Sequence, residues 1–328
     1  MDTPYGQTLR LPEPLLLSIA ITNSCSKPCR HCSASLVPDH RALHVNPVTS
    51  TWWRRIIESD IPNVLLTGGE PLHNPSLRSL ISTLIEAGKG VFVFTHGNAS
   101  EVTPLAEEFG ARVTFGLSLY GDDRTHDSLR GDGSFASLQE TTAKVRQAGG
   151  RTLLNCVVSP GKPDGLAYLG SKNCRLRPHR VLISQTIGVG RAGRRDEAQK
   201  PERAYSEWQR SIKANLRCPV VVGVNGNDDA SSRNRIAKIA EAIVKHALGI
   251  KPFVGCSVGQ WGMHVSASGS VHMCALGETL APVGSLTDSP LAIAWQKLQQ
   301  IGVSQGFGCH VEKATRSKSV YMPTIGVT

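Results

Sequence analysis

Three cysteines near the N-terminus are the residues of this chain best suited to chemistry. Cys25, Cys29 and Cys32 lie within eight residues, directly after the apolar run Leu15–Ile21. A [4Fe–4S] cluster normally takes four thiolates, so three would leave one iron open to bind and activate a substrate. Pro28 disfavours a regular helix here, because proline lacks an amide donor and clashes with the preceding turn. The spacing therefore predicts a tight loop wrapped around a metal centre.

From the residues alone, the metal bound by these cysteines could be either an iron–sulfur cluster or zinc. A structural zinc site needs four ligands in a tetrahedral set, and His31, between the cysteines, is poorly placed to be the fourth. Disulfides are disfavoured because the chain has nine cysteines, an odd number, and its N-terminus lacks an apolar signal core. We therefore expect reduced cysteines and a cytoplasmic location.

A second group of cysteines lies in the C-terminal part. Cys256 and Cys274 bracket residues 262–273, whose alternating segments around a Gly-containing turn are typical of a hairpin. Cys309 follows the last expected helix and is next to His310. These four residues fit a Cys₃His zinc site, and buried cysteines without metal are the other interpretation from the residues alone.

The elements that would position these groups follow a regular alternation. Strands are expected at Leu15–Ile21, Asn63–Leu66, Gly90–Thr95, Arg112–Leu119, Thr152–Val158 and Arg180–Ile187. Helices are expected at Thr51–Ser59, Leu77–Ala87, Val102–Glu108, Phe135–Ala148 and Asp164–Leu169. Short apolar strands that alternate with helices predict a parallel α/β sheet. Further helices are expected at Glu202–Leu216, Arg233–Leu248 and Pro290–Ile301, with a strand at Pro219–Val224.

Composition limits the class of protein. The 328 residues are 40% hydrophobic and 19% charged, as in a soluble globular protein with a substantial core. No apolar run approaches the roughly 18 residues of a membrane span, so no membrane partner is expected. The net charge of +10 permits anionic partners, but only 5% of the residues are aromatic, which leaves few platforms for stacking nucleic-acid bases. A zinc-binding basic nucleic-acid module is the alternative of another class, and the lack of known finger spacings disfavours it.

The cysteine pattern, Cys-x3-Cys-x2-Cys after a first strand, resembles the signature of the radical S-adenosylmethionine (SAM) superfamily. His31 occupies the place just before the third cysteine, where an aromatic-type residue is typical of the family.

Three further segments resemble elements of the same superfamily, in the same order. Val64–Pro71 resembles the "GGEP" element of the second strand. Val93–Asn98 resembles the "TNG" element of the third, with His96 in place of the usual Asn. Leu117–Gly121 and His126–Phe135 resemble the fourth-strand segment of the SPASM/twitch branch.

This resemblance implies an architecture. We expect a partial (β/α)6 barrel in residues 1–200 and a helical connector in 201–255. A small twitch-like module with an auxiliary cluster would follow in 256–310, and a basic tail in 311–328.

The resemblance also implies ligands. The SAM-binding [4Fe–4S] cluster would be held by Cys25, Cys29 and Cys32. The residues expected to contact SAM are His31, Gly68, Gly69, Glu70, Thr95, Ser118 and Arg130. Glu70 has a purely structural alternative, as the cap of a helix after Pro71. A second [4Fe–4S] cluster would be held by Cys256, Cys274 and Cys309. Its fourth ligand stays open among His310, Cys218, a backbone group and the substrate.

The activity implied is hydrogen abstraction from an unactivated carbon by the 5′-deoxyadenosyl radical, with flavodoxin or ferredoxin as electron donor. Only 14 residues precede Leu15, so we expect no fused peptide-recognition domain. The main expectation is a small natural-product intermediate, such as a sugar, aminocyclitol or nucleoside of antibiotic biosynthesis, that is epimerised or dehydrogenated. Epimerisation would need a hydrogen donor, for which Cys218 is the first candidate. The alternative is epimerisation or crosslinking of a ribosomal peptide.

Overall fold

A single curved sheet organises the molecule. The computed structural model describes residues 11–27, 29, 31–32, 42–158, 164–185, 215, 220–222, 262–275, 278 and 281–304. Within them the sheet order is β10-β9-β8-β1-β2-β3-β4-β5-β6-β7. The strands are β1 (Leu16–Thr22), β2 (Asn63–Gly68), β3 (Gly90–Thr95), β4 (Val113–Leu119), β5 (Arg151–Val158), β6 (Arg180–Gln185), β7 (Val220–Val222), β8 (Gly262–Val265), β9 (Ser270–His272) and β10 (Gly284–Ser285).

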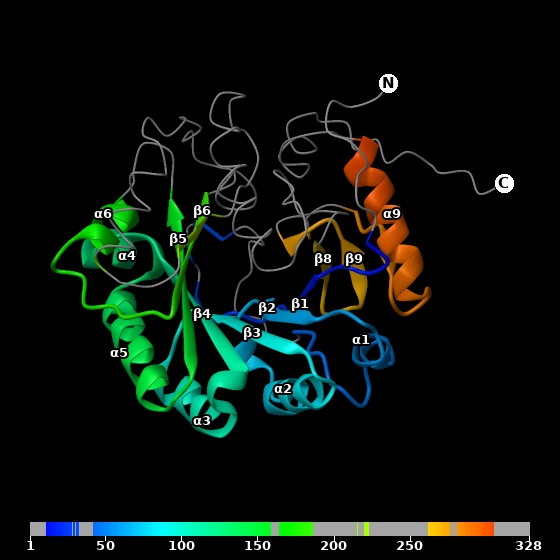
Figure 1. The fold of residues 1–328 in the computed structure, drawn as a ribbon, viewed down its shortest axis with the longest axis horizontal. Helices are drawn as coiled ribbons and strands as arrows, with labels where there is room; N and C mark the ends of the chain where they lie inside the picture. The colour runs from blue at the N-terminus through cyan, green and yellow to red at the C-terminus, as the bar shows by residue number, and fades with distance from the viewer. Residues whose placement is uncertain are drawn as a thin grey trace.

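The helices lie mainly on the convex face of this sheet, as Figure 1 shows for α1, α2, α3 and α5. They are α1 (Trp53–Ile57), α2 (Leu77–Glu86), α3 (Ala99–Phe109), α4 (Asp123–Arg130), α5 (Ser134–Gln147), α6 (Asp164–Gly170) and α9 (Leu291–Ser304), with short 3-10 helices η1 (Pro71–His73) and η2 (Gly110–Arg112). Strands β1 to β7 pair in parallel, each with the next. The predicted α/β class and partial barrel are confirmed.

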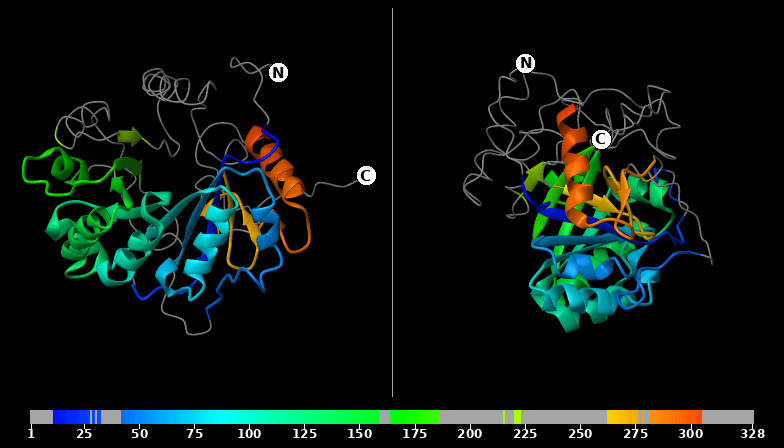
Figure 2. Two further views of the ribbon diagram at one scale, coloured as in Figure 1. Left: turned by 60° about the horizontal axis from the view of Figure 1, so that its bottom comes forward. Right: turned by 90° about the vertical axis from the view of Figure 1, so that its right-hand side faces the viewer.

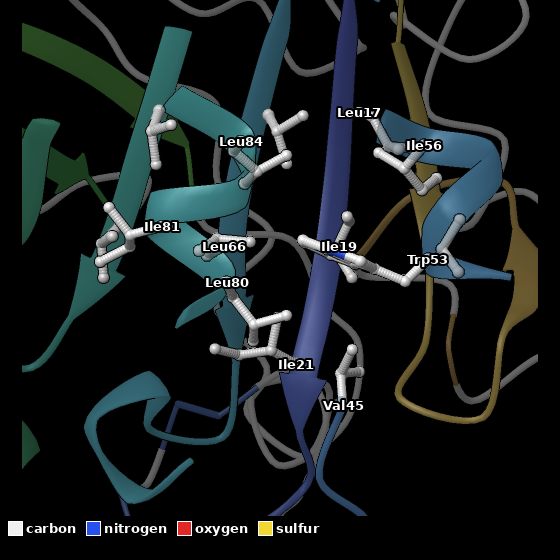
Figure 3. Packing of buried hydrophobic residues seen from close by; sticks show 14 of the residues in the cluster. Leu17, Ile19, Ile21, Val45, Trp53, Ile56, Leu66, Leu80, Ile81 and Leu84 are labelled. Carbon is white, nitrogen blue, oxygen red and sulfur yellow. The ribbon is translucent and has the colours of Figure 1, made fainter. Parts of the chain in front are cut away.

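The alternation along β1 separates the core from the concave face. Leu17, Ile19 and Ile21 are fully buried, and Figure 3 shows them among side chains of α1 and α2, including Trp53 and Leu84. Burial of one such side chain stabilises the fold by roughly 1.5–3 kcal/mol. Because successive strand residues point to opposite faces, the intervening residues of β1 face the concave side of the sheet.

A second hydrophobic cluster lies between β4–β6 and the helices α5 and α6. Cys156 of β5 and Cys174 belong to it, and both are buried. Burial raises the pKa of both thiols, so both are neutral core residues. Cys156 is thus a small apolar residue of the core.

The C-terminal segment extends the barrel sheet on its other side. Strand β8 pairs in parallel with β1, and the hairpin β8–β9 turns at Gly269, whose φ is +85°. Glycine is required at this position because the positive φ disfavours any side chain, and because a Cβ would lie 2.8 Å from the Trp52 ring. Helix α9 lies beside β8 and β9 (Figures 1 and 2), where Trp295 Nε1 donates to Leu11 O at 2.8 Å.

The expected elements and the observed ones agree closely for β1 to β6, where ends differ by at most two residues. Helix α4 was not predicted. The expected helices at 202–216 and 233–248, the connector 201–255 for the most part, and the tail 311–328 lie outside the described residues. Among the helices that are described, none is long and apolar enough to cross a membrane.

Candidate active site

The three N-terminal cysteines lie in the loop that leaves the carboxyl end of β1. The amide of Cys32 donates to Cys29 O at 3.3 Å, which closes a turn, and the Cys25 thiol donates to Lys27 O at 3.7 Å. Burial raises the pKa of Cys25; the bond to Lys27 opposes this, and the negative charges of Glu70, Cys29 and Cys32 add to it. The three thiols thus lie within one another's electrostatic field. Metal ligation deprotonates such thiols, so the donor set fits a metal cluster.

Among the described residues, no group of three or more His, Cys, Asp or Glu side chains has the geometry that holds a single ion. Zinc requires its ligands to converge on one point, whereas a four-iron cluster distributes its thiolates over several metal atoms.

The chain after β2 continues along this cysteine loop. Gly69 N donates to Thr22 O and Glu70 N to Ser24 O, both at 2.8 Å. A Cβ at Gly68 would lie 2.1 Å from Thr22 O, and one at Gly69 would lie 1.9 Å from Ser24 O. Both glycines are thus required for the close approach of two backbones. This contact holds the cysteine loop against the segment predicted to bind SAM.

The Glu70 side chain connects the ends of β2 and β3. It is 1% exposed. Its Oε1 accepts from Thr95 Oγ1 at 2.6 Å and from Leu72 N at 3.2 Å, and its Oε2 accepts from His96 N at 2.9 Å and His96 Nδ1 at 2.5 Å. Burial by itself raises the pKa of Glu70, but the bonds and charge of His96 and the bond from Thr95 outweigh it, so the pKa falls below its usual range. Glu70 is therefore a fully bonded carboxylate that also caps η1, as its structural alternative predicted.

The side chains of His31, Tyr120 and Arg130 lie together at the end of β4, with the His31 and Tyr120 rings tilted by 48°. The ring centroids of His31 and Tyr120 are 4.2 Å apart, and the Arg130 guanidinium lies 5.2 Å from the Tyr120 centroid. Burial raises the pKa of Tyr120, while Arg130 and a hydrogen bond with Ser118 oppose the rise. Tyr120 was not singled out from the sequence. Its position two residues beyond Ser118, on the same face of the strand, is the signal that would have found it.

Arg130, the last residue of α4, extends the site toward the cysteine loop. Cys29 and Glu70 contribute to raising its pKa, so its charge lies near both. Its Nε is buried and has no hydrogen-bond partner within the described part of the chain. Lys27 Nζ donates to Ser134 Oγ at 3.2 Å, and burial lowers the pKa of Lys27, an effect that the charge of Arg130 reinforces. A guanidinium with an unused donor beside the cysteine loop fits a carboxylate ligand.

A polar chain lines the concave face on β1 and β8. His264 is 1% exposed; its Nδ1 lies 3.0 Å from Ser18 Oγ and its Nε2 2.5 Å from Glu278 Oε1. His264 pairs across the sheet with both Ser18 and His272. Since β9 runs antiparallel to β8, Cys274 beyond it lies toward the amino edge of the parallel strands, opposite the N-terminal cysteines.

The structure thus brings together one group of predicted site residues and leaves another untested. Those gathered at the carboxyl edge are Cys25, Cys29, Cys32, His31, Gly68, Gly69, Glu70, Thr95, Ser118 and Arg130. Of the auxiliary group only Cys274 is described; Cys256, Cys309 and Cys218 lie outside the described residues, as does His310.

Comparison with known proteins identifies the domain. Residues 19–166 match the Radical SAM superfamily. This segment is a radical SAM domain. The radical SAM family uses SAM and a [4Fe–4S] cluster, and these are the cofactors of this domain.

Among similar sequences, the PqqA peptide cyclase of Ruegeria pomeroyi is 28% identical over 63% of this chain and 56% of its own length. The sporulation killing factor maturation protein SkfB of Bacillus subtilis is 24% identical over 55% and 44%. The chain therefore spans about half the length of these two relatives. The GTP 3′,8-cyclase of Xanthomonas axonopodis pv. citri is 26% identical over 99% of this chain and 98% of its own.

Solved structures share the fold of this radical SAM chain. Streptococcus suis SuiB superposes with a TM-score of 0.67, 14% identity, and coverage of 94% of this chain and 76% of SuiB. The anSMEcpe enzyme with bound AdoMet gives 0.55 at 16% identity, over 87% and 81%. These likenesses bear on the fold alone.

Proposed function

We propose that this radical SAM enzyme modifies a ribosomally made peptide, as a member of the SPASM/twitch branch. The observation that carries the proposal is the similarity to a peptide cyclase and to a killing-factor maturation protein, in the region that contains the cysteine loop. SuiB, which shares the fold, has also been crystallised with its precursor peptide SuiA. These relatives favour a peptide over the sugar or aminocyclitol expected from the sequence. Bond formation is favoured over epimerisation or dehydrogenation, because two of the similar proteins are named cyclases.

A nucleotide substrate is the second candidate. The GTP 3′,8-cyclase of Xanthomonas axonopodis aligns with nearly the whole of both chains. The net charge of +10 also suits a triphosphate. This candidate keeps the small-molecule expectation in one form, a nucleoside derivative.

The residues of the carboxyl edge have separate roles in this proposal. Cys25, Cys29 and Cys32 would hold the cluster, and SAM would bind beside it. When bound, these two groups would supply radical chemistry for hydrogen abstraction from the substrate. Gly68–Glu70 would contact the methionyl amine, and Arg130 would bind the methionyl carboxylate through its unused Nε donor. The remaining SAM contacts would be His31, Thr95 and Ser118.

The concave face would form the substrate chamber. Ser18 and His264 lie on its wall, between the N-terminal cysteines at one edge and Cys274 at the other. We propose that Cys274 holds an auxiliary cluster together with Cys256 and Cys309, and that flavodoxin or ferredoxin supplies the electron. Cys218 would have a role as hydrogen donor only if the reaction is an epimerisation.

Anaerobic reconstitution followed by SAM and dithionite tests the proposal. We expect about eight irons per chain for two clusters, and formation of 5′-deoxyadenosine. Cys29→Ala should abolish 5′-deoxyadenosine formation, whereas Cys174→Ala, which changes a buried cysteine of the second hydrophobic cluster, should retain it. Cleavage retained in Cys29→Ala would refute the assignment of the cluster ligands. Product formation with synthetic precursor peptides or with GTP then separates the two substrate candidates.

A further inference from the structure

His96 departs from the sequence element that its segment resembles, and the structure shows where its ring goes. Its Nδ1 donates to Glu70 Oε2 at 2.5 Å, and its backbone N donates to the same oxygen at 2.9 Å. The carboxylate is 1% exposed and the His96 side chain 14% exposed. His96 therefore lies on the accessible side of Glu70.

Glu70 has no acceptor site to spare. A carboxylate has about four lone-pair sites on its two oxygens. In Glu70 they face four donors: Thr95 Oγ1, Leu72 N, His96 N and His96 Nδ1. A ligand ammonium group can therefore bind the Glu70 carboxylate only if it displaces one of these donors.

Three of the four donors are fixed by their surroundings. Leu72 N belongs to η1, and His96 N belongs to the main chain that leaves β3. The Thr95 side chain is 5% exposed, and its hydroxyl also accepts from Gly97 N at 3.1 Å. The His96 imidazole is the donor that a side-chain rotation alone removes.

We propose that the His96 imidazole is a gate for SAM: it occupies the Glu70 oxygen that the methionyl ammonium takes, and it must swing away for SAM to bind. The inference rests on the proposed contact between Glu70 and the methionyl amine. His96 and the ammonium group are then competitors for one carboxylate oxygen.

SAM binding to the reconstituted holoenzyme tests this inference, with SAM itself as the probe. Affinity is measured anaerobically at one fixed pH. We expect His96→Asn to bind SAM about tenfold more tightly than the wild type, because the imidazole that competes for Glu70 Oε2 is gone. His73→Asn is the matched control, because the His73 ring contacts Ser24 Oγ and not Glu70. It should keep the wild-type affinity.

The outcomes separate this inference from the proposed function. Wild-type holoenzyme that binds no SAM would refute both. If the wild type binds SAM and His96→Asn binds it with equal or weaker affinity, the gate alone is refuted. His96→Leu gives a second test that removes every side-chain donor, and the unfolding midpoint and iron content of each variant identify those that fail to fold.

Discussion

Gly69→Ala tests the packing of the cysteine loop against the segment that follows β2. An added Cβ would lie 1.9 Å from Ser24 O and 3.1 Å from Cys25 Cβ, whereas ordinary contacts begin at 3.4 Å. The two backbones must therefore separate by more than an ångström. Overpacking of this kind costs about 3 kcal/mol, the upper end of the usual range, because the nearest atom belongs to the backbone.

This shift also moves a predicted cluster ligand. Metal sites tolerate changes of about 0.2 Å in ligand distance, much less than the displacement expected at Cys25. We expect Gly69→Ala to lose most of the iron of the N-terminal cluster. The apo protein should unfold about 4 °C below the wild type, because the unfolding entropy of a 328-residue chain is large.

Two measurements check this prediction: anaerobic thermal unfolding followed by circular dichroism, and iron per chain after reconstitution. Gly284→Ala is the matched control, because a Cβ there meets nothing closer than 3.9 Å. If Gly69→Ala matched this control in both unfolding midpoint and iron content, the reasoning about close backbone approach would be wrong.

Four further predictions concern other parts of the molecule. Cys156→Ser places a hydroxyl at a fully buried position and should lower the free energy of unfolding by about 2 kcal/mol in denaturant titration. Arg55→Met removes the bonds to Leu286 O and Ser289 O and should cost about 1–3 kcal/mol; unchanged stability would contradict the contact. The pKa of Glu70 is lowered in the folded protein, so the stabilisation from this carboxylate is present above its ordinary pKa of 4.5 and is lost as pH falls through the folded pKa. The stability difference between the wild type and Glu70→Gln should therefore shrink in acid. Arg130→Leu should weaken SAM binding about tenfold or more in anaerobic titration, and full affinity would exclude Arg130 as the carboxylate ligand.

Local patterns predicted much of the barrel. The strands β1 to β6 are short apolar runs, and each lies between stretches with helical periodicity, so their positions follow from alternation alone. Helix α4 was missed because Asp123–Arg130 is almost entirely polar and lacks an apolar stripe. Its signal is the cap, where Asp122 Oδ1 accepts from Thr125 N at 3.0 Å.

The candidate site divides in the same way. The three cysteines and the Gly68–Gly69 pair could be recognised because metal ligation and close backbone approach each demand particular residue types at fixed spacing. The partners of Glu70 could not, since Thr95 and His96 are about 25 residues away along the chain. Only the parallel pairing of β2 and β3 brings their carboxyl ends together.

The sequence by itself predicted the cysteine loop, the strand and helix alternation, and the hairpin of β8 and β9. All three depend on residues close together in the chain. The tertiary structure alone decided that β8 pairs with β1 and that His264 contacts Ser18 and Glu278 on the concave face. It also decided that the His96 imidazole bonds to the Glu70 carboxylate. These contacts depend on how the sheet curves and on which strands become neighbours, and that is set by the packing of the whole core.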